Sequence, residues 1–255
     1  MNQKGFLGLI ILIISGVFLL MISLVLYSVN LRYPLFEKCL QVDNTIPMYG
    51  NVKKCGAQKL SDDLFIINAT NAKPFVESSR QRAADSLIRL AWEYSSSGQF
   101  DIAMRRLNQA WLLDPTNPSI FWGFGNVLAQ KKNFSESFKM YDTALSLDPL
   151  SPEPKATIFC NYGLSYLQSG RQIDENADTL AQENEILDKA SDLLQSGLQI
   201  NPKNGQCHSL MAIIFYEQEK YQDAWKEIKI AEENGFENPQ ELIDKVSEKM
   251  PDPES

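Results

Sequence analysis

The chain has 255 residues, of which 44% are hydrophobic, and its formal net charge is −8. An apolar fraction of this size is enough to bury a sizeable core, so the composition excludes a disordered protein. The acidic balance, together with the lack of any lysine and arginine cluster, argues against a nucleic-acid partner. The length allows one or two domains.

The first thirty residues predict a membrane anchor. Residues 5–29 carry no charged side chain, and a helix of that length reaches roughly 37 Å, more than the ~30 Å of a hydrocarbon core. The apolar run is longer than that of a cleavable signal peptide, and no small-residue cleavage pattern follows it. We therefore expect residues 1–30 to be a retained transmembrane helix, with removal of the segment as the alternative. A short tail ahead of a single span favours export of the large domain.

The next segment, residues 31–73, has scattered prolines and glycines and no sustained periodic pattern, so we expect a stalk or a small irregular cap. It contains Cys39 and Cys55, and the two other cysteines are Cys160 and Cys207. An even cysteine count is typical of disulfides in an exported domain. A bond between Cys39 and Cys55 would contribute about 3 kcal/mol in the chain-entropy model. Four unpaired thiols are the alternative.

From residue 74 onward the pattern is helical and repetitive. The stretch Leu107–Pro115 recurs 34 residues later as Tyr141–Pro149, and a third copy, Leu194–Pro202, keeps the same internal spacing. Each copy forms the second of two helices, and the first of these pairs carries Ala91 and Ala103. Short antiparallel helices approach closely where such small residues face each other. The period therefore predicts a stack of helix hairpins.

The later units depart from the period in defined places. The third contains fifteen additional residues between Gly170 and Ala190, an insertion we place at 171–187, and such insertions form loops or lengthen the flanking helices. The fourth unit ends irregularly, with Phe236 where a proline is expected. Asn238 and Pro239 then open a last helix, which we expect to cap the stack.

This pattern of small and aromatic positions resembles the tetratricopeptide repeat (TPR) family, whose 34-residue unit reads W-x2-L-G-x2-Y, then A-x3-F, then a small residue and proline. The resemblance covers residues 84–236. It implies an all-α, right-handed α-solenoid of about four TPR hairpins and a capping helix, preceded by the transmembrane helix. The expected parts of the 74–255 domain are repeats at 84–117, 118–151, 156–203 and 205–237 and the capping helix at 239–250.

The resemblance also implies a binding groove, because the first helices of successive TPR units line a concave surface. The residues expected to face it for a protein or extended peptide partner are Ile88, Trp92, Ser119, Trp122, Asn126, Ala129, Cys160, Leu164, Ser209, Ile213 and Tyr216. Two tryptophans at such positions indicate anchors for an apolar segment. Burial of Trp92 or Trp122 by the upstream segment or by adjacent helices is the alternative. Ile88 and Trp92 replace the Lys and Asn of the family's carboxylate clamp, although Asn126 is kept, so an acidic chaperone tail is not the expected ligand.

The residues that carry chemistry give no support to an enzyme. The chain has one histidine, His208, which we interpret as a packing or surface residue rather than a general base, and it has no catalytic sequence motif. We therefore expect no cofactor and no metal. A calcium loop is the alternative, because Asp174, Asn176, Asp178 and Glu185 have EF-hand spacing. Thr179 stands where that loop needs glycine, which favours a solvated acidic loop or a helical extension.

These observations together predict a single-pass membrane protein that presents a TPR scaffold to protein partners, with its C-terminal domain in the periplasm of a bacterial cell envelope, at the inner membrane. Two alternatives stay open. One is a cytosol-facing TPR receptor on a membrane, and the other is an assembly chaperone for a secreted or cofactor-bearing subunit.

Overall fold

The computed structural model describes four stretches of the chain, residues 44–50, 77–147, 151–170 and 179–253. Its contacts divide the chain into two units, Met1–Pro74 and Phe75–Ser255. The predicted membrane anchor and most of the predicted stalk lie outside the described residues. Among the helices in the described stretches, none combines the length and the apolar character needed to cross a bilayer.

The first unit is described only at residues 44–50. These residues contain η1 (Pro47–Gly50), a short 3-10 element in which Met48 and Tyr49 have left-handed backbone with φ of 51° and 53°.

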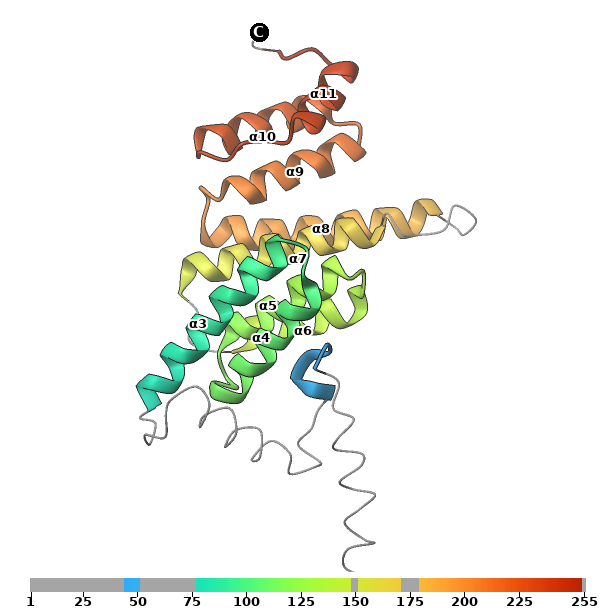
Figure 1. Cartoon of the computed structure of the whole chain (residues 1–255). Helices are drawn as coiled ribbons and strands as arrows, with labels where there is room; N and C mark the ends of the chain where they lie inside the picture. Colours follow the sequence, from blue (N-terminus) through green and yellow to red (C-terminus); the bar gives the residue numbers. More distant parts are fainter. Residues whose placement is uncertain (1–43, 51–76, 148–150, 171–178, 254–255) are drawn as a thin grey trace, which may run out of the picture. The chain divides into compact units, whose positions relative to one another are not determined.

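The second unit is built from helix hairpins (Figure 1). Its described residues form nine α-helices and no strand, and eight of the helices pair in chain order. The pairs are α3 (Glu77–Ser96) with α4 (Phe100–Leu113), α5 (Pro118–Gln130) with α6 (Phe134–Ser146), α7 (Pro152–Gly170) with α8 (Thr179–Ile200), and α9 (Gly205–Glu217) with α10 (Tyr221–Glu233), followed by the single helix α11 (Gln240–Lys249). The prediction of an all-α array of hairpins is confirmed for this unit.

Small residues bring the two helices of a hairpin together, as the sequence predicts. Ala91 and Ala103 are buried in the first hairpin. In the second, a Cβ added to Gly125 would lie 3.0 Å from the ring of Tyr141. Ser137 stands where the repeat pattern has alanine, and its buried hydroxyl donates to the carbonyl of Gly125 at 2.8 Å. The serine therefore satisfies its own polar group inside the interface.

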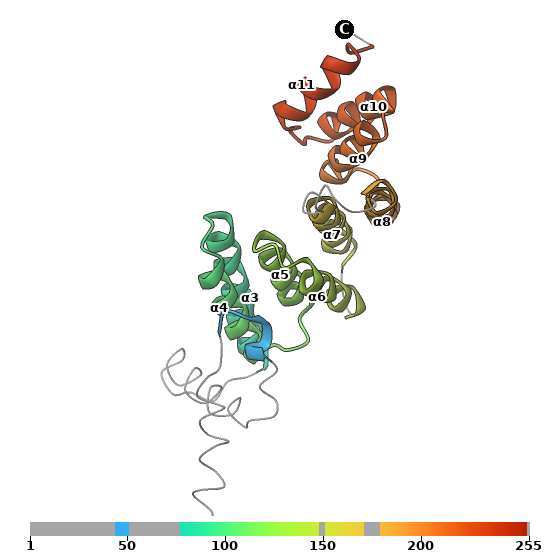
Figure 2. The same ribbon diagram turned by 90° about the vertical axis from the view of Figure 1, so that its right-hand side faces the viewer.

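The hairpins stack in chain order. Each hairpin contacts the next, and the first helices α3, α5, α7 and α9 contact one another in succession. Figure 2 views this succession from the side. We call these four helices the first-helix row. Its contacts bury apolar side chains between hairpins as well as within them, which is how a repeat array builds a continuous core.

Three of the hairpins turn through the same backbone conformation. Gly98, Lys132 and Glu219 have φ of 75°, 61° and 59°. In each turn the amide of the next residue donates to the carbonyl five residues earlier, at 2.8–2.9 Å. This is the Schellman arrangement, in which glycine is the preferred left-handed residue. Only the first of the three turns has glycine at that position.

The third hairpin departs from the others through the predicted insertion. Ala190 is the twelfth residue of α8, whereas the matching Ala103 and Ala224 are each the fourth residue of their helices. The insertion therefore adds eight residues, about two turns, to the start of α8. The described helices also extend beyond the predicted repeat boundaries, since α3 begins at Glu77 rather than 84 and α7 at Pro152 rather than 156.

The last helix, α11, lies within the segment expected to cap the stack. Leu242 and Val246 are buried against α10 in a cluster that includes Trp225. The indole Nε1 of Trp225 donates to the carbonyl of Met250 at 2.9 Å, and Lys229 forms an ion pair with Asp252 at 2.7 Å. Apolar burial and these two polar contacts together fix α11 and the residues after it on α10.

Candidate functional site

The predicted groove residues separate into two groups by exposure. Four of them do not face an open groove, because their side chains are buried: Ile88, Ala129, Cys160 and Ser209. The expectation that all eleven point outward is wrong for these four. Successive helices of the first-helix row contact one another, so a position turned toward the neighbouring row helix is closed. The partly exposed group consists of Trp92, Ser119, Trp122, Asn126, Leu164, Ile213 and Tyr216.

Two of the partly exposed residues form a tryptophan pair on α3 and α5. The rings of Trp92 and Trp122 meet edge to face, with centroids 4.9 Å apart at an interplanar angle of 61°. Each ring therefore covers part of the other. Each of the two tryptophans is thus partly covered by the adjacent helix of the first-helix row. The indole Nε1 of Trp122 and the amide Nδ2 of Asn126 are buried donors without a hydrogen-bond partner among the described residues.

An aromatic cluster joins the second hairpin to the third. We call Phe138, Tyr141, Tyr162 and Tyr166 the tyrosine junction. Phe138 stacks on Tyr166 with ring centroids 4.1 Å apart, and Tyr141 stacks on Tyr162 at 5.0 Å. Rings in such geometry add stability beyond the area they bury. The cluster therefore packs α6 against α7.

The hydroxyl groups of the junction are held by polar partners. The Tyr141 hydroxyl donates to Asn126 Oδ1 at 2.8 Å and accepts from the Ser165 hydroxyl at 3.2 Å. The Tyr162 hydroxyl donates to Asp142 Oδ1 at 3.0 Å. Burial raises the pKa of Tyr141 well above its usual range. Burial also raises the pKa of Tyr162, and the neighbouring Tyr166 and Asp142 side chains act in the same direction.

An apolar pocket of about 230 Å³ lies between α7, α9 and α11, and we call it the C-terminal pocket. Three predicted groove residues, Leu164, Ile213 and Tyr216, line it together. The other lining residues are Leu167, Gln168, Glu217, Pro239, Glu241, Leu242 and Lys245. The structure thus brings part of the predicted groove together with residues of the last helix. Residues from separate repeats converge here on one concave feature, the usual form of a binding site.

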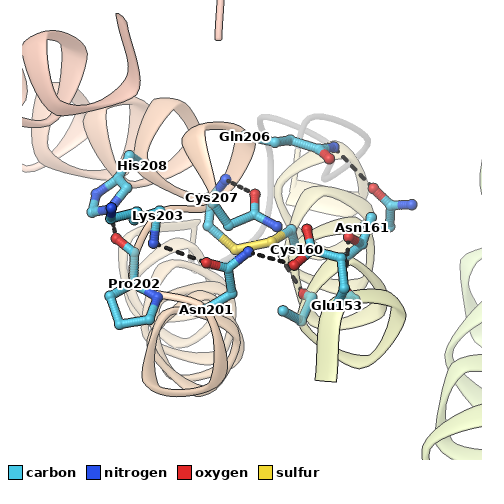
Figure 3. Close-up of a disulfide and its surroundings, with 12 residues drawn as sticks. Glu153, Cys160, Asn161, Asn201, Pro202, Lys203, Gln206, Cys207 and His208 are labelled. Carbon is cyan, nitrogen blue, oxygen red and sulfur yellow. Dashed lines mark hydrogen bonds between the residues drawn. A yellow bond between two sulfur atoms is a disulfide. The ribbon is translucent and has the colours of Figure 1, made fainter. Parts of the chain in front are cut away.

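A disulfide between Cys160 and Cys207 holds two walls of this pocket together (Figure 3). It joins α7 to α9, with the two Cα atoms 5.2 Å apart, and both cysteines are fully buried. The sequence marked both residues as possible disulfide partners without pairing them with each other. The other candidate pair, Cys39 and Cys55, lies outside the described residues.

Hydrogen bonds connect α7 with the loop that precedes α9 and with the first turn of α9, on either side of the disulfide. Asn201 Nδ2 donates to Glu153 Oε2, and Gln206 Nε2 donates to Asn161 Oδ1, each at 2.9 Å (Figure 3). The disulfide and these bonds determine the spacing of α7 and α9, and the C-terminal pocket lies between the same two helices.

The single histidine links α9 to its hairpin partner α10. His208 is 9% exposed, its Nδ1 lies 2.6 Å from Glu227 Oε2, and its Nε2 lies 3.0 Å from the carbonyl of Pro202. Both ring nitrogens are thus engaged by acceptors of the protein. This arrangement agrees with the interpretation of His208 as a packing residue, and it offers no free nitrogen for acid or base chemistry.

The calcium alternative is largely untested by the structure. Asp174, Asn176 and Asp178 lie outside the described residues, and Glu185 is an exposed residue of α8. Within the described stretches, no group of three or more histidine, cysteine or acidic side chains is arranged to hold a metal ion.

Several residues of the site were not found from the sequence. Leu167, Leu242 and Lys245 belong to the C-terminal pocket, yet no motif marks them. From the sequence alone, the last helix is interpreted only as a cap over the stack. Its place in the chain was the available signal, because a helix that directly follows the fourth hairpin takes the place of a fifth first helix.

Comparisons with known proteins bear on the fold alone. No family model matches the sequence, and no curated protein matches it. Two solved structures match with a TM-score of 0.54. The thermophilic TPR protein TTC0263 of Thermus thermophilus is 16% identical, and the alignment covers 66% of this chain and 81% of that one. This chain has a TPR-like fold.

The second match is the structure of the APC/C hetero-tetramer Cut9-Hcn1. It is 17% identical over 77% of this chain and 35% of that one, so the chain spans about a third of its length. Identity at this level shows shared architecture and does not carry over partners or sites. The fold assigned from the repeat spacing is therefore supported by an independent comparison, and function has to be argued from the site itself.

Proposed function

We propose that this chain is a scaffold that binds protein partners along its first-helix row, with the C-terminal pocket as the principal contact. The observation that carries the proposal is the convergence of Leu164, Ile213 and Tyr216 on one apolar hollow together with α11. Partly exposed apolar side chains around a concave feature are typical of protein docking sites. The TPR-like fold supports the proposal, because stacked helix pairs present extended concave surfaces of this kind.

A role in binding fits the chemistry of the site better than catalysis does. The pocket is lined mainly by leucine, isoleucine and tyrosine side chains, with charged groups at its edge. His208 has both ring nitrogens occupied and does not line the pocket. Catalysis of acyl or phosphoryl transfer needs a nucleophile or base beside stabilising donors. The pocket presents no such combination among its lining residues.

The proposal also includes the surroundings in which the scaffold acts. The uncharged run at residues 5–29 supports a membrane anchor, and the disulfide between Cys160 and Cys207 supports an oxidising compartment for the domain. We propose that the domain is exported and membrane-anchored, in the periplasm of a bacterial envelope, where it holds the partners of an envelope or secretion assembly.

Site-specific photo-crosslinking tests the docking surface in cells that produce the full chain. A photoreactive residue at Tyr216 lines the pocket, whereas the same residue at the exposed Gln195 on α8 is a matched control. We expect discrete adducts from position 216 that disappear when Ile213→Asp is added. The same adducts from both positions, or adducts that persist with Ile213→Asp, would contradict docking at the pocket.

The compartment of the domain is tested by thiol labelling of cells that are quenched with acid and then dissolved in denaturant. In a chain with Cys39→Ser and Cys55→Ser, we expect Cys160 and Cys207 to resist alkylation in denaturant until a reductant is added. Carbonate extraction of the membranes should leave the chain in the pellet. Two free thiols would instead favour a cytosol-facing domain, and release into the supernatant would remove the anchor.

A further inference from the structure

A second hollow, of about 190 Å³, lies beside the C-terminal pocket, between α7, α8 and α9. It shares the lining residues Leu167, Ile213 and Glu217 with that pocket. Its other lining residues are Gly170, Glu183, Ile186 and Leu187. Because three residues line both hollows, the two form one double pocket. Each is smaller than the roughly 300–1,000 Å³ typical of small-molecule sites. Their sizes suit individual side chains of a partner better than a cofactor.

The insertion in the third repeat builds one wall of this double pocket. Residues 179–186 of α8 form the additional turns relative to α4 and α10, and Glu183 and Ile186 belong to them. The regular repeats have no counterpart of these turns. The second hollow therefore depends on the third hairpin and is not a feature that every hairpin of the stack would possess.

The charges around the double pocket are mostly negative. Lys245 is the single basic residue among those that line it, and its ammonium is paired with Glu241 at 2.7 Å. Glu183 and Glu217 are exposed, and within the described part of the chain neither carboxylate has a salt-bridge partner. Leu167 and Ile213 line both hollows, as Glu217 does, and Glu183 lines the second. The double pocket therefore combines apolar lining residues with two glutamates that have no salt-bridge partner among the residues that the structure describes.

We propose that the double pocket binds a partner segment that places two neighbouring apolar side chains in the two hollows and lysine or arginine beside Glu183 and Glu217. This inference rests on the proposed scaffold function and specifies the chemistry of its partner. The apolar side chains supply the burial, while the basic groups select the segment by charge complementarity and reject acidic segments.

Peptide binding to the full-length chain in detergent tests this specificity. The probe is a fluorescein-labelled peptide of about 14 residues with two leucines at i and i+4 and lysines around them. A charge-reversed peptide has glutamate for lysine, and an anchor-free peptide has alanine for leucine. By anisotropy we expect the basic probe to bind at least about tenfold more tightly than either comparison peptide. The charge preference should shrink between about 20 mM and 300 mM salt.

Variants locate the effect on the protein. Glu183→Gln combined with Glu217→Gln should reduce the preference for the basic probe at least about fivefold while preserving the weaker leucine-dependent binding. Leu167→Asp should abolish binding of all leucine probes. The matched control is Asp192→Asn with Glu233→Gln, which removes two exposed acids on α8 and α10 outside the pockets. Circular dichroism and thermal midpoints show that each variant is folded.

The outcomes separate this inference from the scaffold proposal. Equal binding of the basic and charge-reversed probes, or an unchanged preference in the Glu183→Gln and Glu217→Gln variant, would overturn the basic partner while leaving an apolar docking site. Loss of preference in the control variant would overturn it as well, since general acidity would then be the cause. Absence of all peptide binding, together with absence of adducts from position 216, would overturn the scaffold proposal itself.

Discussion

The first two hairpins and the region from α7 to α11 use the same repeat, yet they fill the space along the first-helix row in different ways. In the first region, large rings in edge contact, Trp92 and Trp122, lie on adjacent row helices. In the second region, the row helices carry the smaller Leu164 and Ile213, and these side chains line the C-terminal pocket together with residues of α11. The same face of the first-helix row thus carries paired tryptophan rings in the first region and contains a pocket in the second.

Departures from the repeat account for this difference. The second region contains the lengthened α8, the disulfide between α7 and α9, and a last helix that is not part of a hairpin. Each of these contributes a wall of the double pocket or joins two of its walls. The periodic residues build a stack of hairpins, and the residues that break the period build the candidate site. Three perturbations, namely loss of the disulfide, alkaline pH and substitutions in the hairpin turns, test how independent the two regions are.

Loss of the disulfide should have the largest effect. Cys160 and Cys207 are 47 positions apart, and the chain-entropy model gives about 4 kcal/mol for a loop of this size. We expect Cys160→Ala with Cys207→Ala to lower the free energy of unfolding by up to this amount, and hydrogen exchange should localise the loss to α7–α10. Equal loss of protection in α3–α6 would show that the two regions unfold as one.

Reduction of the native chain is the control for cavity effects of the substituted alanines. With Cys39→Ser and Cys55→Ser in both proteins, a reductant should reproduce most of the loss in the chain that keeps Cys160 and Cys207, and it should produce no further loss in the variant that lacks them. A native chain that is insensitive to reductant would show that these thiols are not paired.

Alkaline pH should weaken the connection between the two regions, because buried tyrosines join them. The pKa of Tyr141 is about 10 in an unfolded chain and is raised in the fold by burial. Above pH 10 the unfolded chain releases a proton that native Tyr141 retains, so stability decreases as the pH rises. The expected slope is about 1.4 kcal/mol per pH unit for this residue. Below pH 10 it contributes no slope.

Urea midpoints at pH 9 to 11 measure this slope. Tyr141→Phe should lower stability at pH 9 through the lost hydrogen bonds but should reduce the alkaline slope by one tyrosine's share. Phe138→Leu, which removes a ring of the tyrosine junction without removing a phenol, is the matched control and should keep the slope. An unchanged slope in Tyr141→Phe would show that this phenol does not cause the alkaline loss.

The sequence predicted the periodic part of the fold well. The small and apolar positions that define the repeat, such as Ala103, Ala144 and Leu194, are fully buried. A 34-residue spacing is sufficient for this, because the residues that pack two helices of one hairpin lie close in the chain. The helices, their pairing and their order could therefore be predicted without tertiary information.

The candidate site was less predictable, because it depends on how hairpins are rotated against one another. Ile88, Ala129 and Ser209 lie on first helices as predicted but are buried rather than open to a groove. The partner of Cys160 depends on the stacking of the third hairpin on the fourth across an insertion. Leu242 reaches the pocket only because α11 lies beside α9. No local spacing in the sequence specifies such rotations.

The smallest expected effect concerns the hairpin turns, which occur in both regions. Lys132 in the first region and Glu219 in the second have left-handed backbone. Gly98 occupies the matching position in the turn of the first hairpin. A side chain in this conformation costs roughly 1 kcal/mol, while glycine adds disorder to the unfolded chain. We therefore expect Lys132→Gly and Glu219→Gly each to stabilise by about 0.5 kcal/mol, and Gly98→Ala to destabilise.

The helices in which this stabilisation is measured show whether the two regions unfold separately. If the regions unfold separately, hydrogen exchange should show slower opening of α5 and α6 alone in Lys132→Gly and of α9 and α10 alone in Glu219→Gly. If the tyrosine junction couples them, each glycine should slow opening on both sides of it, because a stack with strong contacts between hairpins distributes a local gain along its length. Ala129→Gly, in the last turn of α5, where the backbone is right-handed, should destabilise instead, which separates a conformational effect of glycine from a general one.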